Sequence, residues 1–139
     1  MIHIIAGEKG KGKTKLLIAK ANDDIQEMNG SLIYIDKSNK HMYELSNKIR
    51  LINSKDYFIT NADEFLGFIC GILSSDHDLE KIYLDSFLKI ACINENELEP
   101  VLMKLNDIYN HFDVDCVISL SANKKKVPES FSDSVIVAL

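Results

Sequence analysis

Gly7-Glu8-Lys9-Gly10-Lys11-Gly12-Lys13-Thr14 matches the pattern G-x-x-x-x-G-K-[ST] at every required position. The segment directly follows Ile2–Ala6, a short apolar run that is typical of a buried strand. From Lys13 to Met28, apolar residues recur at helical spacing. A glycine-rich turn that joins a strand to a helix is the context that this pattern requires. The sequence therefore predicts a strand, a loop and a helix, in that order, at the start of the chain.

The residue types of this loop indicate its chemistry. Glycines allow the backbone to turn its N–H groups toward phosphate oxygens, and the helix N-terminus adds a partial positive charge. We expect Lys13 to reach the β- and γ-phosphates of ATP, and the Thr14 hydroxyl to coordinate Mg²⁺. Three further lysines add positive charge around the loop. The residues expected to bind ATP are Gly7, Glu8, Lys9, Gly10, Lys11, Gly12, Lys13, Thr14 and Lys15.

A loop of this kind normally works with an aspartate at the end of another buried strand, which helps to hold the magnesium ion. Two residues qualify. Asp36 follows the apolar run Leu32–Ile35, and Asp85 follows Lys81–Leu84. Both are also compatible with an ordinary aspartate at a strand end or a helix N-cap.

Short apolar runs alternate with helical patterns along the whole chain. Strands are expected at 2–6, 32–35, 57–60, 81–84, 116–120 and 135–139, and helices at 13–28, 42–49, 62–75 and 98–112. Strands that are continuously apolar are typical of a parallel sheet covered on both faces. We therefore expect one α/β domain over residues 1–139, with three α/β/α layers and a mainly parallel sheet of five to six strands.

This succession resembles the RecA-like branch of P-loop ATPases. In that branch, the second strand ends in an acidic catalytic residue, and a third strand and a long helix precede the strand that ends in the magnesium aspartate. The corresponding segments here are Ile33-Tyr34-Ile35-Asp36, Tyr57–Thr60, Ala62–Ser75 and Ile82-Tyr83-Leu84-Asp85-Ser86. The resemblance implies the sheet order 3-2-4-5-1-6. It favours Asp85 over Asp36 as the magnesium residue and makes Lys13, Asp36 and Asp85 the catalytic candidates.

A second set of segments supports a closer resemblance. It consists of Gly7–Lys15, Arg50-Leu51-Ile52 with Tyr57, Phe65-Leu66-Gly67-Phe68 with Gly71-Ile72, and Val127-Pro128-Glu129-Ser130. These segments resemble a family of very short bacterial ATP-binding proteins that are often labelled twitching-motility-like. The label implies nothing about pili for this chain, because the extra domain that such motors have does not fit in 139 residues.

The catalytic base is the weakest part of the RecA-like pattern. A RecA-like ATPase activates its attacking water with a glutamate near the end of the second strand, and Ser38 occupies that position here. Asp36 could substitute if its carboxylate came within hydrogen-bond reach of the water. Glu8 and Glu64 are weaker candidates. We therefore expect slow hydrolysis, or binding without turnover.

Other polar residues have possible roles that the sequence leaves open. Arg50 is the only arginine and hence the only candidate arginine finger, although a solvated surface residue is the alternative. Lys124-Lys125-Lys126 follows the fifth strand and is either an anion-binding patch or a solvated loop. Ser119 and Ser121 end that strand, either as sensors of the γ-phosphate or as ordinary polar residues.

Composition excludes several other classes of protein. With 139 residues and a formal net charge of −5, the chain favours neither a second domain nor general binding of nucleic acid. Its three cysteines lie in apolar stretches, which is typical of reduced core thiols in a cytoplasmic protein. No apolar run is long enough to span a membrane or to form a signal peptide.

Two other nucleotide-dependent activities fit the sequence less well. A small-molecule kinase normally uses several arginines and a closing lid, whereas this chain has one arginine and no long insertion. A GTPase would need an N-K-x-D motif, but after Asn123-Lys124 the aspartate position is Lys126. We therefore predict an Mg-ATP-binding RecA-like protein, with weak or partner-activated ATPase activity and a protein partner or second copy. The alternative is a nucleotide-gated interaction module without significant hydrolysis.

Overall fold

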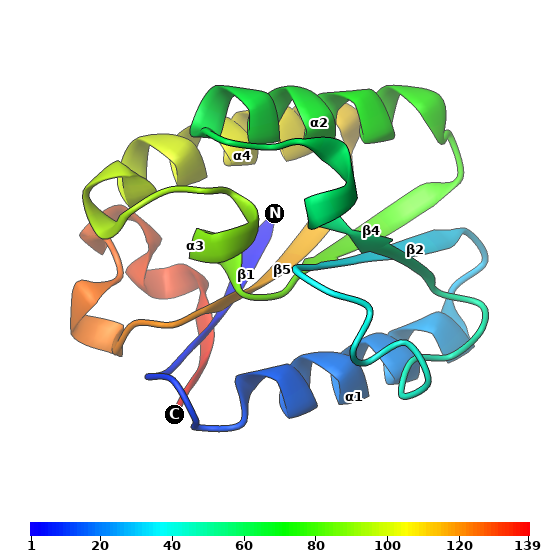
Figure 1. Cartoon of the computed structure of the whole chain (residues 1–139), viewed down its shortest axis with the longest axis horizontal. Coiled ribbons are helices and arrows are strands. Elements are labelled where there is room, and N and C mark those ends of the chain that lie inside the picture. The colour runs from blue at the N-terminus through cyan, green and yellow to red at the C-terminus, as the bar shows by residue number, and fades with distance from the viewer.

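The computed structural model describes all 139 residues and shows a six-stranded parallel sheet between two helical layers (Figure 1). The strands are β1 (Ile2–Ala6), β2 (Ser31–Asp36), β3 (Arg50–Asn53), β4 (Leu79–Leu84), β5 (Asp115–Leu120) and β6 (Val135–Ala138). The α-helices are α1 (Lys13–Glu27), α2 (Ala62–Ser75), α3 (Phe87–Ile90) and α4 (Leu98–Phe112). Four short 3-10 helices are η1 (Ser54–Tyr57), η2 (Glu95–Glu97), η3 (Lys124–Lys126) and η4 (Glu129–Ser134).

The order of strands across the sheet is β3-β2-β4-β5-β1-β6, which confirms the predicted order. β5 lies between β1 and β4, so Ile4 pairs with Ile118 and Ile82 pairs with Cys116. Because every strand is parallel to its neighbours, their carboxyl ends meet at one edge of the sheet. The loops that follow β1, β2, β4 and β5 therefore emerge close together.

Each face of the sheet has its own hydrophobic core. On one face, α1 covers a cluster that includes Ile5, Leu17 and Tyr34. On the other, α2, α3 and α4 cover a larger cluster of 29 buried residues (Figure 1). The amphipathic pattern of α4 is satisfied there, because its apolar residues Leu98, Val101, Leu102, Leu105 and Tyr109 are buried. The central strands are apolar on both sides because helices cover both faces of the sheet.

The third strand is not where the sequence analysis expected it. The expected segment, 57–60, begins with the last residue of η1, and its Tyr57 and Phe58 are exposed. The strand is Arg50–Asn53, which pairs with the end of β2 at the edge of the sheet. Because this short edge strand buries only Ile52 fully, its sequence shows little of the apolar run by which a buried strand is recognised.

Two smaller expectations were also wrong. The segment 42–49 forms turns rather than a helix, although Leu45 and Ile49 are buried beneath it against the α1 side of the core. Cys92 was expected in the core but is exposed, whereas Cys116 is buried and Cys70 is partly buried. No helix has both the length and the apolar composition needed to cross a membrane.

The cysteines provide a test of this arrangement. Burial raises the pKa of the Cys116 thiol to about 12, so this group stays protonated and shielded at pH 8. We expect iodoacetamide at pH 8 to modify Cys92 in the native protein and to modify Cys116 only after unfolding in urea. Peptide mass spectrometry over a time course measures both rates. Equal rates at Cys92 and Cys116 in the native protein would contradict the packing of β5.

Candidate functional site

The glycine-rich loop between β1 and α1 depends on left-handed backbone conformations. Gly10 has a φ of 86° and Gly12, the N-cap of α1, has a φ of 85°. Side chains larger than hydrogen are strained in this region, so these two positions require glycine. Apart from each glycine and its two neighbours in the chain, no atom lies within 4 Å of where a Cβ would project from either residue. The space beside Gly10 and Gly12 is therefore open.

Lys13 is the first residue of α1, and its side chain folds back into the loop. The residue is buried, and its Nζ donates a hydrogen bond to the Glu8 carbonyl oxygen at 3.0 Å. Desolvation lowers the pKa of Lys13, while the negative charge of Asp85 acts in the opposite direction. The loop thus holds an ammonium group at its centre with only one hydrogen-bond partner from the protein.

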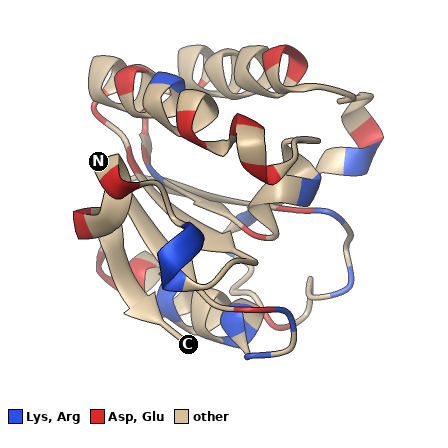
Figure 2. Ribbon diagram, turned by 90° about the vertical axis from the view of Figure 1, so that its left-hand side faces the viewer, with Lys and Arg blue, Asp and Glu red and all other residues tan.

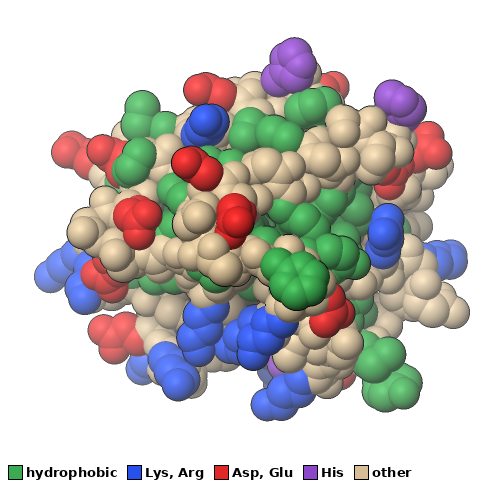
Figure 3. Space-filling view, turned by 45° about the horizontal axis from the view of Figure 1, so that its top comes forward, with side chains coloured by type: hydrophobic (Ala, Val, Ile, Leu, Met, Phe, Trp, Pro, Cys, Tyr) green, Lys and Arg blue, Asp and Glu red, His purple; other side chains and the backbone are tan.

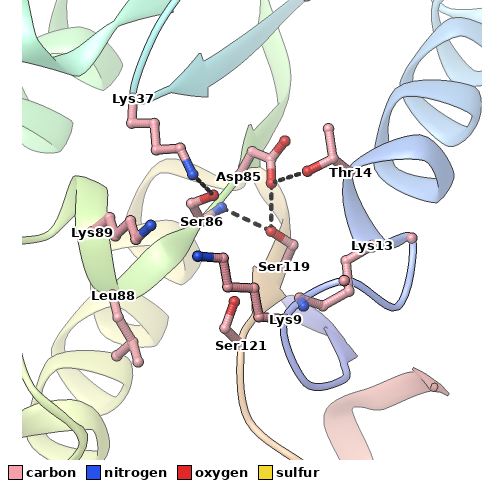
Figure 4. A pocket seen from close by; sticks show the side chains of 12 residues that line it. Lys9, Lys13, Thr14, Lys37, Asp85, Ser86, Leu88, Lys89, Ser119 and Ser121 are labelled. Carbon is pink, nitrogen blue, oxygen red and sulfur yellow. Dashed lines mark hydrogen bonds between the residues drawn. The ribbon is translucent and has the colours of Figure 1, made fainter.

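Asp85 directly follows β4 and is buried at the carboxyl edge of the sheet. Its Oδ1 accepts hydrogen bonds from Thr14 Oγ1 at 3.1 Å and from Ser119 Oγ at 2.7 Å (Figure 4). Its Oδ2 accepts a third from Tyr34 Oη at 2.7 Å. Burial and the charge of Asp85 raise the pKa of Tyr34, so this phenol remains a donor. Residues of α1, β2 and β5 thereby fix one carboxylate.

A cavity of about 400 Å³ lies over these groups (Figure 4). Its lining combines the glycine-rich loop with the ends of β2, β4 and β5. The twelve lining residues are Lys9, Gly10, Gly12, Lys13, Thr14, Lys37, Asp85, Ser86, Leu88, Lys89, Ser119 and Ser121. Ser121 is exposed in this lining, whereas Ser119 is buried and already bonded to Asp85 and to the Ser86 N–H.

Two lysines in the lining were missed by the sequence analysis. Lys37 follows β2 and donates a hydrogen bond from Nζ to Ser86 Oγ at 3.4 Å. Lys89 lies on α3, four residues after Asp85. Figure 4 shows their ammonium ends and that of Lys9 directed toward one region of the cavity. The only signal in the sequence was proximity to Asp36 and Asp85, which does not reveal the direction of a side chain.

Asp36 lies apart from the cavity lining. It is buried at the end of β2, where its Oδ1 accepts a hydrogen bond from the Lys37 N–H at 2.7 Å. Burial, followed by the charge of Asp85, raises the pKa of Asp36, and the hydrogen bond from Lys37 opposes this. Its predicted catalytic role stays a prediction, as do the roles of the exposed rim residues Glu8, Lys11 and Lys15.

The remaining candidates lie elsewhere. Glu64 accepts hydrogen bonds from Thr60 at the N-terminus of α2. Arg50 begins β3 and therefore lies at the amino end of a strand, opposite the edge where the cavity opens. Lys124–Lys126 forms the exposed helix η3, in which Lys126 Nζ is 3.8 Å from a carboxylate oxygen of Glu95.

Charge is distributed unevenly between the two helical layers. Figure 2 shows mainly acidic positions on the upper layer of helices and many Lys or Arg positions in the lower half of the molecule. α2 and α4 contain Asp63, Glu64, Glu99 and Asp107 but only one lysine, Lys104. The basic cavity of this acidic chain is therefore a local feature.

The strand order, the all-parallel sheet and the loop after β1 define a RecA-like α/β fold. Among solved structures, the chain is similar to the flagellar accessory protein FlaH from Methanocaldococcus jannaschii, with a TM-score of 0.59 and 17% sequence identity. The match covers 93% of this chain and 63% of FlaH, and at this identity it shows the fold alone. No protein-family model and no curated protein sequence matches the chain. The resemblance to twitching-motility-like proteins stays a prediction.

The raised pKa of Asp36 predicts a pH-dependent effect on stability. In the folded state Asp36 binds its proton more tightly than in the unfolded state, so its contribution to stability falls as pH rises above its ordinary pKa of 3.8. Asparagine can still accept the Lys37 N–H bond without the buried charge. Without ligands, we expect Asp36→Asn to raise the melting temperature at pH 7.

This gain should shrink as the pH is lowered toward the ordinary pKa of an aspartate, because the wild-type carboxyl then becomes protonated as well. Calorimetry of wild type and Asp36→Asn, from pH 7 down to the ordinary pKa of an aspartate, measures the difference between their melting temperatures. An Asp36→Asn variant that is less stable than wild type by the same amount at every pH would contradict the argument.

Proposed function

We propose that this chain binds Mg-ATP at the loop between β1 and α1 and that it is a weak or partner-activated ATPase. The observation that supports this most strongly is the hydrogen bond of 3.1 Å between Thr14 Oγ1 and Asp85 Oδ1. Residues 71 positions apart in the sequence thus meet at the floor of a cavity lined by the glycine-rich loop. This pairing of hydroxyl and carboxylate is what a magnesium site beside a phosphate loop requires.

The residues present fit both ligands. Mg²⁺ prefers hard oxygen ligands, often one or two from the protein with waters and phosphates completing its coordination. Thr14 and Asp85 offer a hydroxyl and a carboxylate in direct contact. The open, positive-φ glycines at positions 10 and 12 leave room for phosphate oxygens to approach the backbone N–H groups.

In this proposal each group of the chain has a separate task. The N–H groups of the loop and the N-terminus of α1 bind phosphate oxygens, and Lys13 exchanges its contact with the Glu8 carbonyl for the β- and γ-phosphates. Thr14 and Asp85 hold magnesium, which when bound neutralises charge on the phosphates. Ser119 and Tyr34 keep the Asp85 carboxylate oriented toward Thr14.

The lining of the cavity supports slow rather than rapid hydrolysis. Asp85 is the one carboxylate in that lining, and all of its hydrogen bonds are to hydroxyl groups of the protein. A general base must lie within hydrogen-bond reach of the water it activates. Asp36 would therefore have to move, or a partner would have to supply the base, for turnover to become fast.

The lack of a second carboxylate in the cavity lining also favours a second candidate function, a nucleotide-gated interaction module without significant hydrolysis. Exposed aromatic residues offer a surface for a protein partner or a second copy, since Tyr43 is 91% exposed and Phe58 is 86% exposed. Phosphate release from ATP separates the two functions. Release well above background that is lost in Lys13→Ala would exclude the pure interaction module.

A thermal-shift assay tests nucleotide binding directly. At a concentration of Mg-ATP 100 times its Kd, binding should stabilise the wild-type chain by about 2.7 kcal/mol, or roughly 10 °C. Lys13→Ala removes the ammonium group at the centre of the loop and should abolish this shift. Lys104→Ala removes an exposed lysine of α4 and should leave it unchanged. An unchanged shift in Lys13→Ala would contradict the proposed function.

A second experiment separates the two aspartates. Asp85→Asn should weaken magnesium-dependent binding of ATP by about tenfold or more, because a charged ligand of the ion is lost. Asp36→Asn should have a smaller effect, because Asp36 does not line the cavity. Calorimetric titration with and without Mg²⁺ measures both, and circular dichroism establishes beforehand that each variant folds. The opposite ranking would move the magnesium site to the end of β2.

A further inference from the structure

A second cavity, of about 300 Å³, adjoins the cavity over the glycine-rich loop. Lys37 and Lys89 line both cavities, so these two side chains form the boundary between them. The second cavity lies between the end of β2, helix η1 and helix α3. Its lining residues are Lys37, Ser54, Lys55, Ile59, Lys89, Ile90 and Cys92. Lys55 lines the second cavity but not the first, and none of the proposed contacts to ATP uses it.

The positive charge of the second cavity is not neutralised by the protein. Its lining has three lysines and no carboxylate, and none of the three forms an ion pair with an acidic residue. Lys37 lowers the pKa of Lys89 most strongly, with smaller effects from Lys9 and Lys55, which reflects ammonium groups gathered without counter-charges. Figure 3 shows Lys and Arg side chains gathered in the lower half of the visible face.

The walls of this cavity are suited to a small oxyanion. Ser54 is buried in the lining, where its hydroxyl is a further polar group beside the lysines. Asn53 Oδ1 accepts a hydrogen bond from the Lys55 N–H at 3.1 Å, which fixes the turn that presents Lys55. The Cys92 thiol is directed to the Ile59 carbonyl, at 3.2 Å, and not to the centre of the cavity.

We propose that the cavity between η1 and α3 is a second oxyanion-binding site, in which Lys37, Lys55 and Lys89 bind one phosphate group. Three lysines and a serine line this cavity without a carboxylate, and ammonium and hydroxyl groups are the donors that recognise phosphate. The ammonium ends of Lys37 and Lys89 are directed toward the first cavity in Figure 4, so both would turn from this boundary toward Lys55 when phosphate binds. The site itself does not depend on the proposed function. Its position beside the terminal phosphate of a nucleotide does, because Lys37 and Lys89 would then lie between the two phosphate groups.

The ligand is either free phosphate or the phosphate group of a small organic molecule. Ile59 and Ile90 form apolar walls beside the lysines, and these walls would contact the carbon atoms of a phosphomonoester but not free phosphate. Inorganic phosphate and glycerol 3-phosphate are therefore compared as probes. Tighter binding of glycerol 3-phosphate identifies an organic phosphate as the ligand class, and tighter binding of inorganic phosphate identifies the free ion.

The test is carried out on the whole chain with Lys13→Ala, so that phosphate binding at the glycine-rich loop does not obscure the result. Calorimetric titration is done at constant ionic strength, because surface charges bind anions weakly and non-specifically. We expect Lys13→Ala to retain one phosphate site. Adding Lys55→Ala should weaken this site by about tenfold. Adding Lys124→Ala, a matched loss of one exposed lysine on η3, should leave it unchanged.

Each outcome decides between defined alternatives. No phosphate binding in Lys13→Ala, or binding that Lys55→Ala and Lys124→Ala weaken equally, would overturn the second site. Binding that depends on Lys55 supports it, whether or not the wild-type chain binds ATP. Failure of ATP to stabilise the wild-type chain would overturn the proposed function alone, so the two proposals fail separately.

Discussion

The site depends on the burial of one carboxylate, Asp85, at the carboxyl edge of the sheet. A buried carboxylate is costly unless hydrogen-bond donors compensate for the water it loses. Here the compensation comes from three hydroxyl groups on α1, β2 and β5, those of Thr14, Tyr34 and Ser119. The requirement to satisfy Asp85 thus links the loop after β1 to the strands on both sides of β4. Any displacement of these elements would leave a charged group unsatisfied in the core.

The lysines form the second organising feature of the molecule. The chain is acidic overall, yet Lys9, Lys13, Lys37 and Lys89 line one cavity that contains a single carboxylate. On α2 and α4, by contrast, four acidic residues accompany a single lysine. Such separation of charge attracts anions to one face while the net charge remains negative. It also leaves the cations at the mouth of the cavity available to ligands, because acidic side chains do not neutralise them.

Much of the fold followed from local patterns, and the failures have specific causes. The strongly apolar strands and the amphipathic helix 98–112 were predicted because their periodicity reflects burial that is continuous along the element. β3 was misplaced because an edge strand packs on fewer neighbours, whereas the more strand-like Tyr57 and Phe58 are exposed. Cys92 was misassigned because its apolar neighbours Ala91 and Ile93 are buried and Cys92 itself is not.

The sequence by itself determined the loop and its helix, because glycine spacing and the Lys13-Thr14 pair are local properties of the backbone. It also indicated two aspartates, Asp36 and Asp85, and favoured Asp85 only through the order of strands in the RecA-like resemblance. Only the tertiary structure decided that Asp85 contacts Thr14 while Asp36 is buried apart from the cavity. It likewise brought Lys37 and Lys89 together, because the direction of a side chain after a strand depends on the packing of neighbouring elements and not on its own sequence.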